Sequence, residues 1–383
     1  LGVIDRPQAK KRVESSFRVH PAVVLEGPRQ CGKSTLARMI GGSDAVYFDL
    51  ERAVDLQKLA TPEQTLGPLR GLVVIDEAQR LPELFPPLRV LLDRPDVPAK
   101  FLLTGSASPD LVKGLSESLA GRMGMVDLAG FDLRETGGNE FRRLWLRGGF
   151  PRSFLAPDDA ASAEWREAFV RTFLERDLPQ LGITIPAVTL RRFWTVVAHY
   201  HGHVWNAAEF ARSLGVDEKT ARRYLDILAG AFMVRVLPPW FENTKKRQVK
   251  SPKVYVRDTG LLHALLGIVT ADDLAGNPKL GASWEGFVIE QLVVALQSRD
   301  ACFWATHNGA ELDLLVSPRG KRHGFEIKYA DAPGTTKSMR AALEDLRLEH
   351  LWVIYPGADR YHLDTRITVV PASEIPALAR ELM

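Results

Sequence analysis

Residues 27–34 read Gly27-Pro28-Arg29-Gln30-Cys31-Gly32-Lys33-Ser34, which matches the phosphate-binding loop pattern GxxxxGK[ST]. The apolar residues 22–25 before the loop predict a short buried strand, and residues 35–40 after it predict a helix that ends at the glycines 41–42. A strand, a glycine-rich turn and a helix N-terminus in this order turn backbone N–H groups toward phosphate. The stretch therefore predicts an α/β P-loop fold.

Each residue type in this loop has an expected role. Gly27 and Gly32 allow the turn, Lys33 reaches the β- and γ-phosphates of a nucleotide, and the Ser34 hydroxyl is a ligand for Mg²⁺. Cys31 lies near a helix N-terminus, where a thiol pKa is lowered, but we interpret it as a small spacer. The residues expected to bind ATP here are Gly27, Pro28, Arg29, Gln30, Cys31, Gly32, Lys33, Ser34 and Thr35.

A second motif ends a continuous apolar run at residues 72–75, which is typical of a strand covered on both faces of a parallel sheet. Asp76, the next residue, is expected to hold Mg²⁺ directly or through water. Glu77 is expected to orient or polarise the attacking water, the alternative being a solvated acid at the end of a strand.

Three further residues are candidates for sensing the γ-phosphate. The strand predicted at residues 101–106 offers the hydroxyls of Thr104 and Ser106, although Thr-Gly-Ser is equally ordinary turn chemistry. Arg122 is a candidate arginine finger, supplied in cis or by a neighbouring subunit. Its alternative role is that of an exposed structural arginine.

The fold class that we predict is α/β, with a doubly wound P-loop domain first. Predicted strands and helices alternate up to about residue 134. We place the ATPase domain at residues 1–135, a helical linker or lid at 136–188, a winged helix at 189–257 and an αβββαβ domain at 258–383.

The middle of the chain predicts a helix-turn-helix. Asn206 is expected to cap a first helix, Gly215 to end it and Asp217 to cap a second helix at residues 218–229. Strands predicted at 232–237 and 253–256 complete a winged-helix pattern.

The winged-helix segment, residues 189–257, is strongly basic. It carries 13 Lys or Arg against 5 Asp or Glu, a local charge of +8 in a chain of net charge +3, which indicates a polyanionic partner such as DNA. The alternative is a protein-binding winged helix whose charged face is merely solvated. The DNA-contact candidates are Lys219, Thr220, Arg222, Arg223, Lys245, Lys246 and Arg247.

The last domain places acids on neighbouring elements. We expect Ser283 to cap a helix that carries Glu285, and Asp313 to begin a strand. Glu326 and Lys328 lie two residues apart on the next strand and project to one face. Carboxylates on adjacent strands suit Mg²⁺, and a nearby lysine can position metal-bound water for phosphodiester hydrolysis. The alternative is an ordinary half-exposed strand with alternating charged residues.

Composition is that of a globular protein, without an apolar run of the roughly 18–20 residues that a membrane span needs. Residues 1–20 are charged and lack an apolar core, so we expect no secretion signal. Two cysteines form no disulfide framework. These features predict a cytoplasmic protein without a membrane partner.

With these residues in view, nearly the whole chain resembles a prokaryotic family of AAA+-type P-loop ATPases fused to a C-terminal domain long described as of unknown function. The resemblance implies a winged helix in the middle and a nuclease-like fold at the end. The matching stretches are residues 27–34, 74–79, 104–106, 117–122, 148–151, 284–288 and 311–313.

The end domain resembles the PD-(D/E)XK nucleases. Asp313 matches their first strand acid, Glu326 and Lys328 their second motif, and Glu285 their helix acid, while Leu312 replaces the proline. This implies metal ligation by Glu285, Asp313 and Glu326, with Glu326 and Lys328 catalytic and Mn²⁺ as a substitute for Mg²⁺.

The resulting hypothesis is Mg²⁺-dependent ATP hydrolysis coupled to DNA binding and to DNA cleavage by the C-terminal domain. The alternative is a nucleotide-dependent DNA- or protein-binding switch with an inert nuclease fold. A homo-oligomer is compatible with the sequence but is not shown by it.

Overall fold

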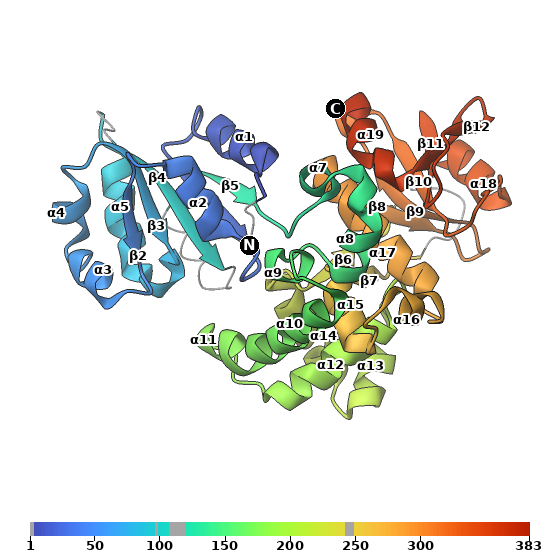
Figure 1. The fold of residues 1–383 in the computed structure, drawn as a ribbon, viewed down its shortest axis with the longest axis horizontal. Coiled ribbons are helices and arrows are strands. Elements are labelled where there is room, and N and C mark those ends of the chain that lie inside the picture. The colour runs from blue at the N-terminus through green and yellow to red at the C-terminus, as the bar shows by residue number, and fades with distance from the viewer. Residues whose placement is uncertain (1–3, 96–98, 107–118, 242–248) are drawn as a thin grey trace. The chain divides into compact units, whose positions relative to one another are not determined.

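The computed structural model describes residues 4–95, 99–106, 119–241 and 249–383 (Figure 1). The chain divides into two compact units. The first unit extends to Gly130 and includes Gly230–Phe232; the second contains Phe131–Ala229 and Met233–Met383. Within the described ranges, no helix is long and apolar enough to cross a membrane.

The first unit is built on a five-stranded sheet with the order β2-β3-β4-β1-β5, in which all neighbours are parallel. This confirms the predicted α/β P-loop domain. The strands are β1 (Ala22–Gly27), β2 (Val46–Asp49), β3 (Gly71–Asp76), β4 (Ala99–Ser106) and β5 (Met123–Asp127).

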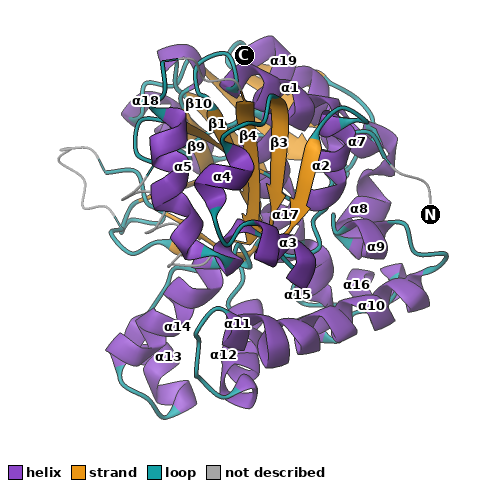
Figure 2. Ribbon diagram, turned by 90° about the vertical axis from the view of Figure 1, so that its left-hand side faces the viewer, coloured by secondary structure: helices purple, strands orange, loops and turns teal. Residues whose placement is uncertain are grey.

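Helices cover both faces of this sheet (Figures 1 and 2). Because side chains alternate along a strand, Val23 and Leu25 face one core while Ala22 and Val24 face the other. The first core is completed by α1 (Pro7–Ser16) and α2 (Lys33–Gly41). The second is completed by α3 (Ala53–Lys58), α4 (Pro62–Leu66) and α5 (Phe85–Leu92).

The second unit begins with helices, which cover most of the segment for which we predict a linker. They are α7 (Leu133–Thr136), α8 (Phe141–Arg147), α9 (Pro151–Phe154), α10 (Asp159–Thr172), α11 (Leu178–Gln180) and α12 (Ala187–His199), with a π-helical turn at Phe173–Asp177. Arg166 on α10 is fully buried and donates to the carbonyls of Leu146 and Gly260, both at 3.0 Å.

The helix-turn-helix elements form as α13 (Ala207–Leu214) and α14 (Glu218–Gly230). The Asn206 side chain accepts from the Glu209 N–H at 3.3 Å, and the Asp217 side chain accepts from the Thr220 N–H at 2.7 Å. Both predicted caps are confirmed. The antiparallel pair β6 (Val234–Leu237) and β7 (Lys253–Val256) follows.

The C-terminal part holds α15 (Thr259–Leu266), α16 (Ala271–Ala275) and a six-stranded sheet with the order β12-β13-β11-β10-β9-β8. The elements α17 (Leu280–Ala295), β8 (Cys302–Ala305), β9 (Glu311–Val316), β10 (His323–Ile327), α18 (Lys337–Asp345) and β11 (His350–Tyr355) follow one another in the predicted order αβββαβ. Three further elements were not predicted, namely β12 (Tyr361–Asp364), β13 (Ile367–Pro371) and α19 (Ile375–Leu382).

The prediction that Ser283 caps α17 is wrong, because the helix begins at Leu280 and the Ser283 N–H donates to the Lys279 carbonyl at 2.8 Å. The Ser283 hydroxyl is fully buried instead. It lies 2.9 Å from Trp145 Nε1 and 2.7 Å from His263 Nε2, so it satisfies polar atoms of the core.

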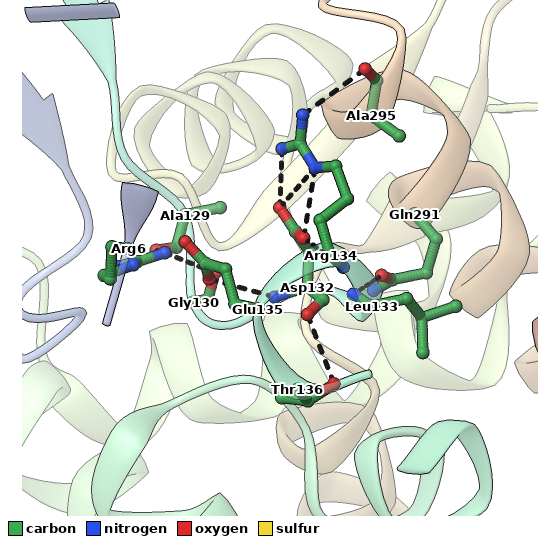
Figure 3. A network of polar contacts seen from close by, with 10 residues as sticks. All are labelled: Arg6, Ala129, Gly130, Asp132, Leu133, Arg134, Glu135, Thr136, Gln291 and Ala295. Carbon is green, nitrogen blue, oxygen red and sulfur yellow. Dashed lines mark hydrogen bonds and ion pairs between the residues drawn. The ribbon is translucent and has the colours of Figure 1, made fainter. Parts of the chain in front are cut away.

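Figure 3 shows polar contacts around residues 129–136, where the chain passes from one unit to the other. In the first unit, the buried Arg6 donates to the carbonyls of Ala129 at 3.1 Å and Gly130 at 3.0 Å. In the second, Asp132 caps α7, whose Leu133 N–H donates to Gln291 on α17 at 2.9 Å. Each end of the segment is therefore fixed within its own unit.

Candidate functional site

The loop between β1 and α2 needs glycine at two positions. A Cβ atom on Gly27 would lie 2.0 Å from the Leu128 carbonyl oxygen, and Gly32 adopts a positive φ of 100°. Lys33 is buried, and its Nζ donates to the carbonyls of Gly27 at 3.0 Å and Pro28 at 2.8 Å. The ammonium group thus lies across the loop where phosphate oxygens would compete for it.

The carboxylate of Asp76, at the end of β3, joins three hydroxyl groups. Ser34 donates to Asp76 Oδ1 at 3.1 Å, Thr104 donates to the same oxygen, and Tyr47 donates to Oδ2 at 2.6 Å. The structure therefore brings the two predicted Mg²⁺ ligands and Thr104 together. Their donor atoms are all oxygen, so Ser34 and Asp76 fit a hard cation.

Tyr47 on β2 was not predicted as a site residue. Burial, and then the hydrogen bond to Asp76, raise the pKa of its phenol, so the hydroxyl remains a donor at neutral pH. In the sequence, Tyr47 is simply one residue of a predicted strand. Only the pairing of β2 with β3 shows that this strand lies beside the one that ends at Asp76.

Glu77 follows Asp76 with φ of 57°, a left-handed conformation that is costly for a residue with a side chain. Its N–H donates to Thr104 Oγ1 at 3.2 Å, and its carboxylate accepts from the Gln79 amide. These contacts fix Glu77 beside Asp76, which is the position its predicted role requires.

Two γ-phosphate candidates remain predictions. Arg122 donates to both oxygens of Asp93, with Nε 2.5 Å from Oδ1 and Nη2 2.9 Å from Oδ2, so a finger role requires this ion pair to open. Ser106 pairs with Gly27 in the β1–β4 register. The structure describes the backbone of Ser106 but not its side chain.

Glu26, just before the loop, is expected to make the stability of this domain depend on pH. Burial, and then the charge of Asp127 opposite it on β5, raise the pKa of Glu26 from 4.5 to about 7. An acid whose pKa rises on folding stabilises fully below its unfolded pKa and loses that contribution as pH rises through its folded pKa. We expect wild type to lose stability relative to Glu26→Gln between pH 5 and pH 8 in paired thermal melts. Parallel pH profiles would contradict this.

The C-terminal residues Glu285, Asp313, Glu326 and Lys328 also come together. Asp313 Oδ2 accepts from the Ile327 N–H at 2.8 Å, and Lys328 Nζ lies 2.6 Å from Glu326 Oε1. Burial, and then the charges of Glu326 and Glu285, raise the pKa of Asp313 well above its usual value. Burial likewise raises the pKa of Glu326.

Metal binding by these carboxylates stays a prediction. In the described ranges, no group of three or more His, Cys, Asp or Glu side chains is arranged to hold a metal ion. Lys253 on β7, which was not predicted as a site residue, lies beside one of these acids. Its Nζ lies 3.1 Å from Glu285 Oε1 and also contacts Glu311, so an ammonium ion is already paired with these two carboxylates.

Three of the DNA-contact candidates on α14 are exposed, namely Lys219, Arg222 and Arg223, while Thr220 is half-buried. Arg222 Nε lies 3.1 Å from Asp226 Oδ1. A groove of about 850 Å³ is lined by Lys219 and Arg222 and by Lys250 from the chain before β7. The basic residues Lys245, Lys246 and Arg247 lie outside the described residues.

Comparison with known proteins gives the family. Residues 19–137 match the AAA domain family, residues 138–272 a domain of unknown function (DUF8612) and residues 280–375 another (DUF4143). The chain is 54% identical over 374 residues to the uncharacterized proteins Mb2031c of Mycobacterium bovis and Rv2008c of Mycobacterium tuberculosis, covering 97% of this chain and 85% of each relative. The chain belongs to their family. Its first unit is an AAA-type P-loop ATPase domain.

Among solved structures, the Walker-type ATPase paby2304 of Pyrococcus abyssi is similar to this chain. The match has 18% sequence identity and a TM-score of 0.50, and covers 69% of this chain and 96% of that one. At this identity the match shows likeness of fold alone.

Proposed function

We propose that this AAA-type protein hydrolyses ATP with Mg²⁺ and that its nucleotide state controls the binding of DNA by residues 189–257. The observation that carries the ATPase part is the contact of Ser34 and Thr104 with Asp76, beside a loop in which Lys33 is already oriented. The basic face of α14 supports the DNA part.

Each side chain of the ATP site has a separate role in the proposed hydrolysis. Mg²⁺, when bound, supplies positive charge that offsets the charge of the phosphates. Lys33 binds phosphate oxygens, and Ser34 and Asp76 hold the cation. Glu77, fixed by Thr104 and Gln79, orients water and accepts its proton. Thr104 and Tyr47 fix both oxygens of Asp76.

DNA binding is tested at two exposed cations of α14. Binding of duplex DNA followed by fluorescence anisotropy is expected to weaken about tenfold at 0.1 M salt when Lys219→Ala and Arg223→Ala are combined. Each phosphate contact contributes about 0.9 to the slope of the logarithm of the binding constant against the logarithm of salt concentration. The loss of two contacts is therefore expected to reduce the magnitude of that slope by about 1.8.

The matched control for this experiment combines Lys10→Ala and Lys11→Ala, two exposed lysines on α1 with the same total charge change. This control is expected to leave DNA affinity near that of wild type. Absence of DNA binding even at low salt would favour the alternative, in which the basic segment binds a protein.

DNA cleavage with Mg²⁺ or Mn²⁺ is the second candidate function. It is favoured by the meeting of Asp313 on β9, Glu326 on β10 and Lys328 directly after β10 with Glu285 on α17. Lys253 pairs with Glu285, and within the described ranges no group of three or more His, Cys, Asp or Glu side chains is arranged to hold a metal ion, so this conformation does not favour metal binding. The conformation therefore favours a switch with an inert nuclease fold.

A further inference from the structure

We propose that the ammonium group of Lys253 is the resident cation of the C-terminal carboxylate cluster, and that it excludes divalent metal from that cluster. The carboxylate cluster is defined here as Glu285, Glu311, Asp313 and Glu326. This role of Lys253 depends neither on ATP hydrolysis nor on DNA binding.

The Lys253 side chain enters the cluster from outside the αβββαβ elements. It comes from β7, and only 6% of it is exposed. Its Nζ lies 3.1 Å from Glu285 Oε1 and also contacts Glu311 Oε1. Tyr255, two residues later on the same strand, donates its hydroxyl to Glu285 Oε1 at 2.6 Å. Two side chains of β7 therefore bind one carboxylate oxygen of α17.

The charge of Lys253 is maintained by its neighbours. Burial alone would lower the pKa of this amine, but the charges of Glu285, Asp313 and Glu311 raise it above its ordinary value. A buried ammonium ion is stable only when it is paired and hydrogen-bonded, and this cluster supplies both conditions. The Lys253 ammonium group is thus paired with the carboxylates of Glu285 and Glu311.

Strand β7 is held so that this ammonium does not leave easily. Trp205 N–H donates to the Pro252 carbonyl at 2.7 Å, and Val249 N–H donates to the Ala305 carbonyl on β8 at 3.0 Å. Arg257, just after β7, lies 2.7 Å from Glu290 on α17. The chain is therefore bonded on both sides of Lys253 to elements of the same unit.

One oxygen of Asp313 and one oxygen of Glu326 are already engaged. Asp313 Oδ2 already accepts a backbone hydrogen bond, and Glu326 Oε1 pairs with Lys328. Glu326 Oε2 is buried and has no hydrogen-bond partner in the described structure. Metal binding would need Glu285 and Asp313, beside which the Lys253 ammonium would repel a dication. Removal of that ammonium should open the cluster.

The test is a Mn²⁺ titration of nucleotide-free protein, in which electron paramagnetic resonance measures free Mn²⁺. Lys253→Met removes the charge but keeps the length of the side chain. We expect the variant to bind one more Mn²⁺ per chain than wild type. The affinity of the cluster for Mn²⁺ is expected to be at least tenfold higher in the variant than in wild type. Combining Lys253→Met with Asp313→Asn is expected to remove the gained site.

The matched control is Lys250→Met, an exposed lysine three residues earlier, which is expected to gain no site. A folded Lys253→Met protein that binds no additional Mn²⁺ overturns the proposal. If that variant does not fold, wild type and Asp313→Asn decide the question. If wild type and Asp313→Asn bind the same number of Mn²⁺ ions per chain, the result supports a cluster closed by Lys253. If Asp313→Asn binds one Mn²⁺ fewer than wild type, the proposal is overturned.

Discussion

Lys33→Ala is expected to lower the kcat/KM of ATP hydrolysis by at least about 10²-fold, the loss typical of removing one preorganised charge-stabilising donor. Lys33 is the buried cation of the phosphate loop, and its Nζ already lies within hydrogen-bond distance of two loop carbonyls. Alanine removes that charge without disturbing the glycines that shape the turn. Phosphate release by purified protein with Mg²⁺ measures the effect.

The control for this measurement is Lys100→Ala, an exposed lysine on β4 of the same domain, which should leave turnover near that of wild type. Turnover of Lys33→Ala within twofold of wild type would mean that ATP is hydrolysed elsewhere, or by a contaminating enzyme.

Glu290→Ala is expected to lower the free energy of unfolding of the second unit by about 3 kcal/mol, the usual scale for breaking a buried ion pair. The Glu290 carboxylate lies 2.6 Å from Arg235 on β6 and 2.7 Å from Arg257 after β7. It therefore ties the β6–β7 pair, and with it Lys253, to α17. Urea unfolding followed by tryptophan fluorescence measures the change, with Glu344→Ala on the exposed side of α18 as control.

Acid should reduce the effect of this substitution. Although burial acts to raise it, Arg235 and Arg257 lower the pKa of Glu290 to about 2. An acid with a lowered pKa stabilises above its unfolded pKa of 4.5, and the contribution is lost as pH falls through the folded pKa. The difference between wild type and Glu290→Ala should shrink as pH falls from 5 toward 2. An undiminished difference would contradict an electrostatic cause.

Local sequence patterns predicted that Ser34 and Asp76 would lie close together, because both belong to motifs with fixed spacing. The apolar run before Asp76 predicted a buried strand, and parallel pairing then placed Asp76 beside the loop that carries Ser34. Thr104 was predicted as one of two possibilities, and only the structure shows its contact with Asp76. The tyrosine at position 47 has no motif, so its contact with Asp76 depends entirely on sheet order.

Local sequence patterns predicted only part of the carboxylate cluster in the C-terminal domain. Spacing predicted that Asp313, Glu326 and Lys328 would meet, but nothing near Lys253 indicated that its side chain would enter the same cluster. That contact joins β7 to α17, which begins more than twenty residues later. Ser283 was assigned a cap for a similar reason, since its buried partners Trp145 and His263 are distant in sequence.

ATP turnover measured with and without duplex DNA tests most directly whether the nucleotide site and the basic segment act together. A nucleotide-controlled DNA switch predicts that DNA raises the turnover rate, and that combining Lys219→Ala with Arg223→Ala removes the increase without changing the rate in the absence of DNA. An identical turnover rate with and without DNA, at DNA concentrations that saturate binding, would contradict that coupling.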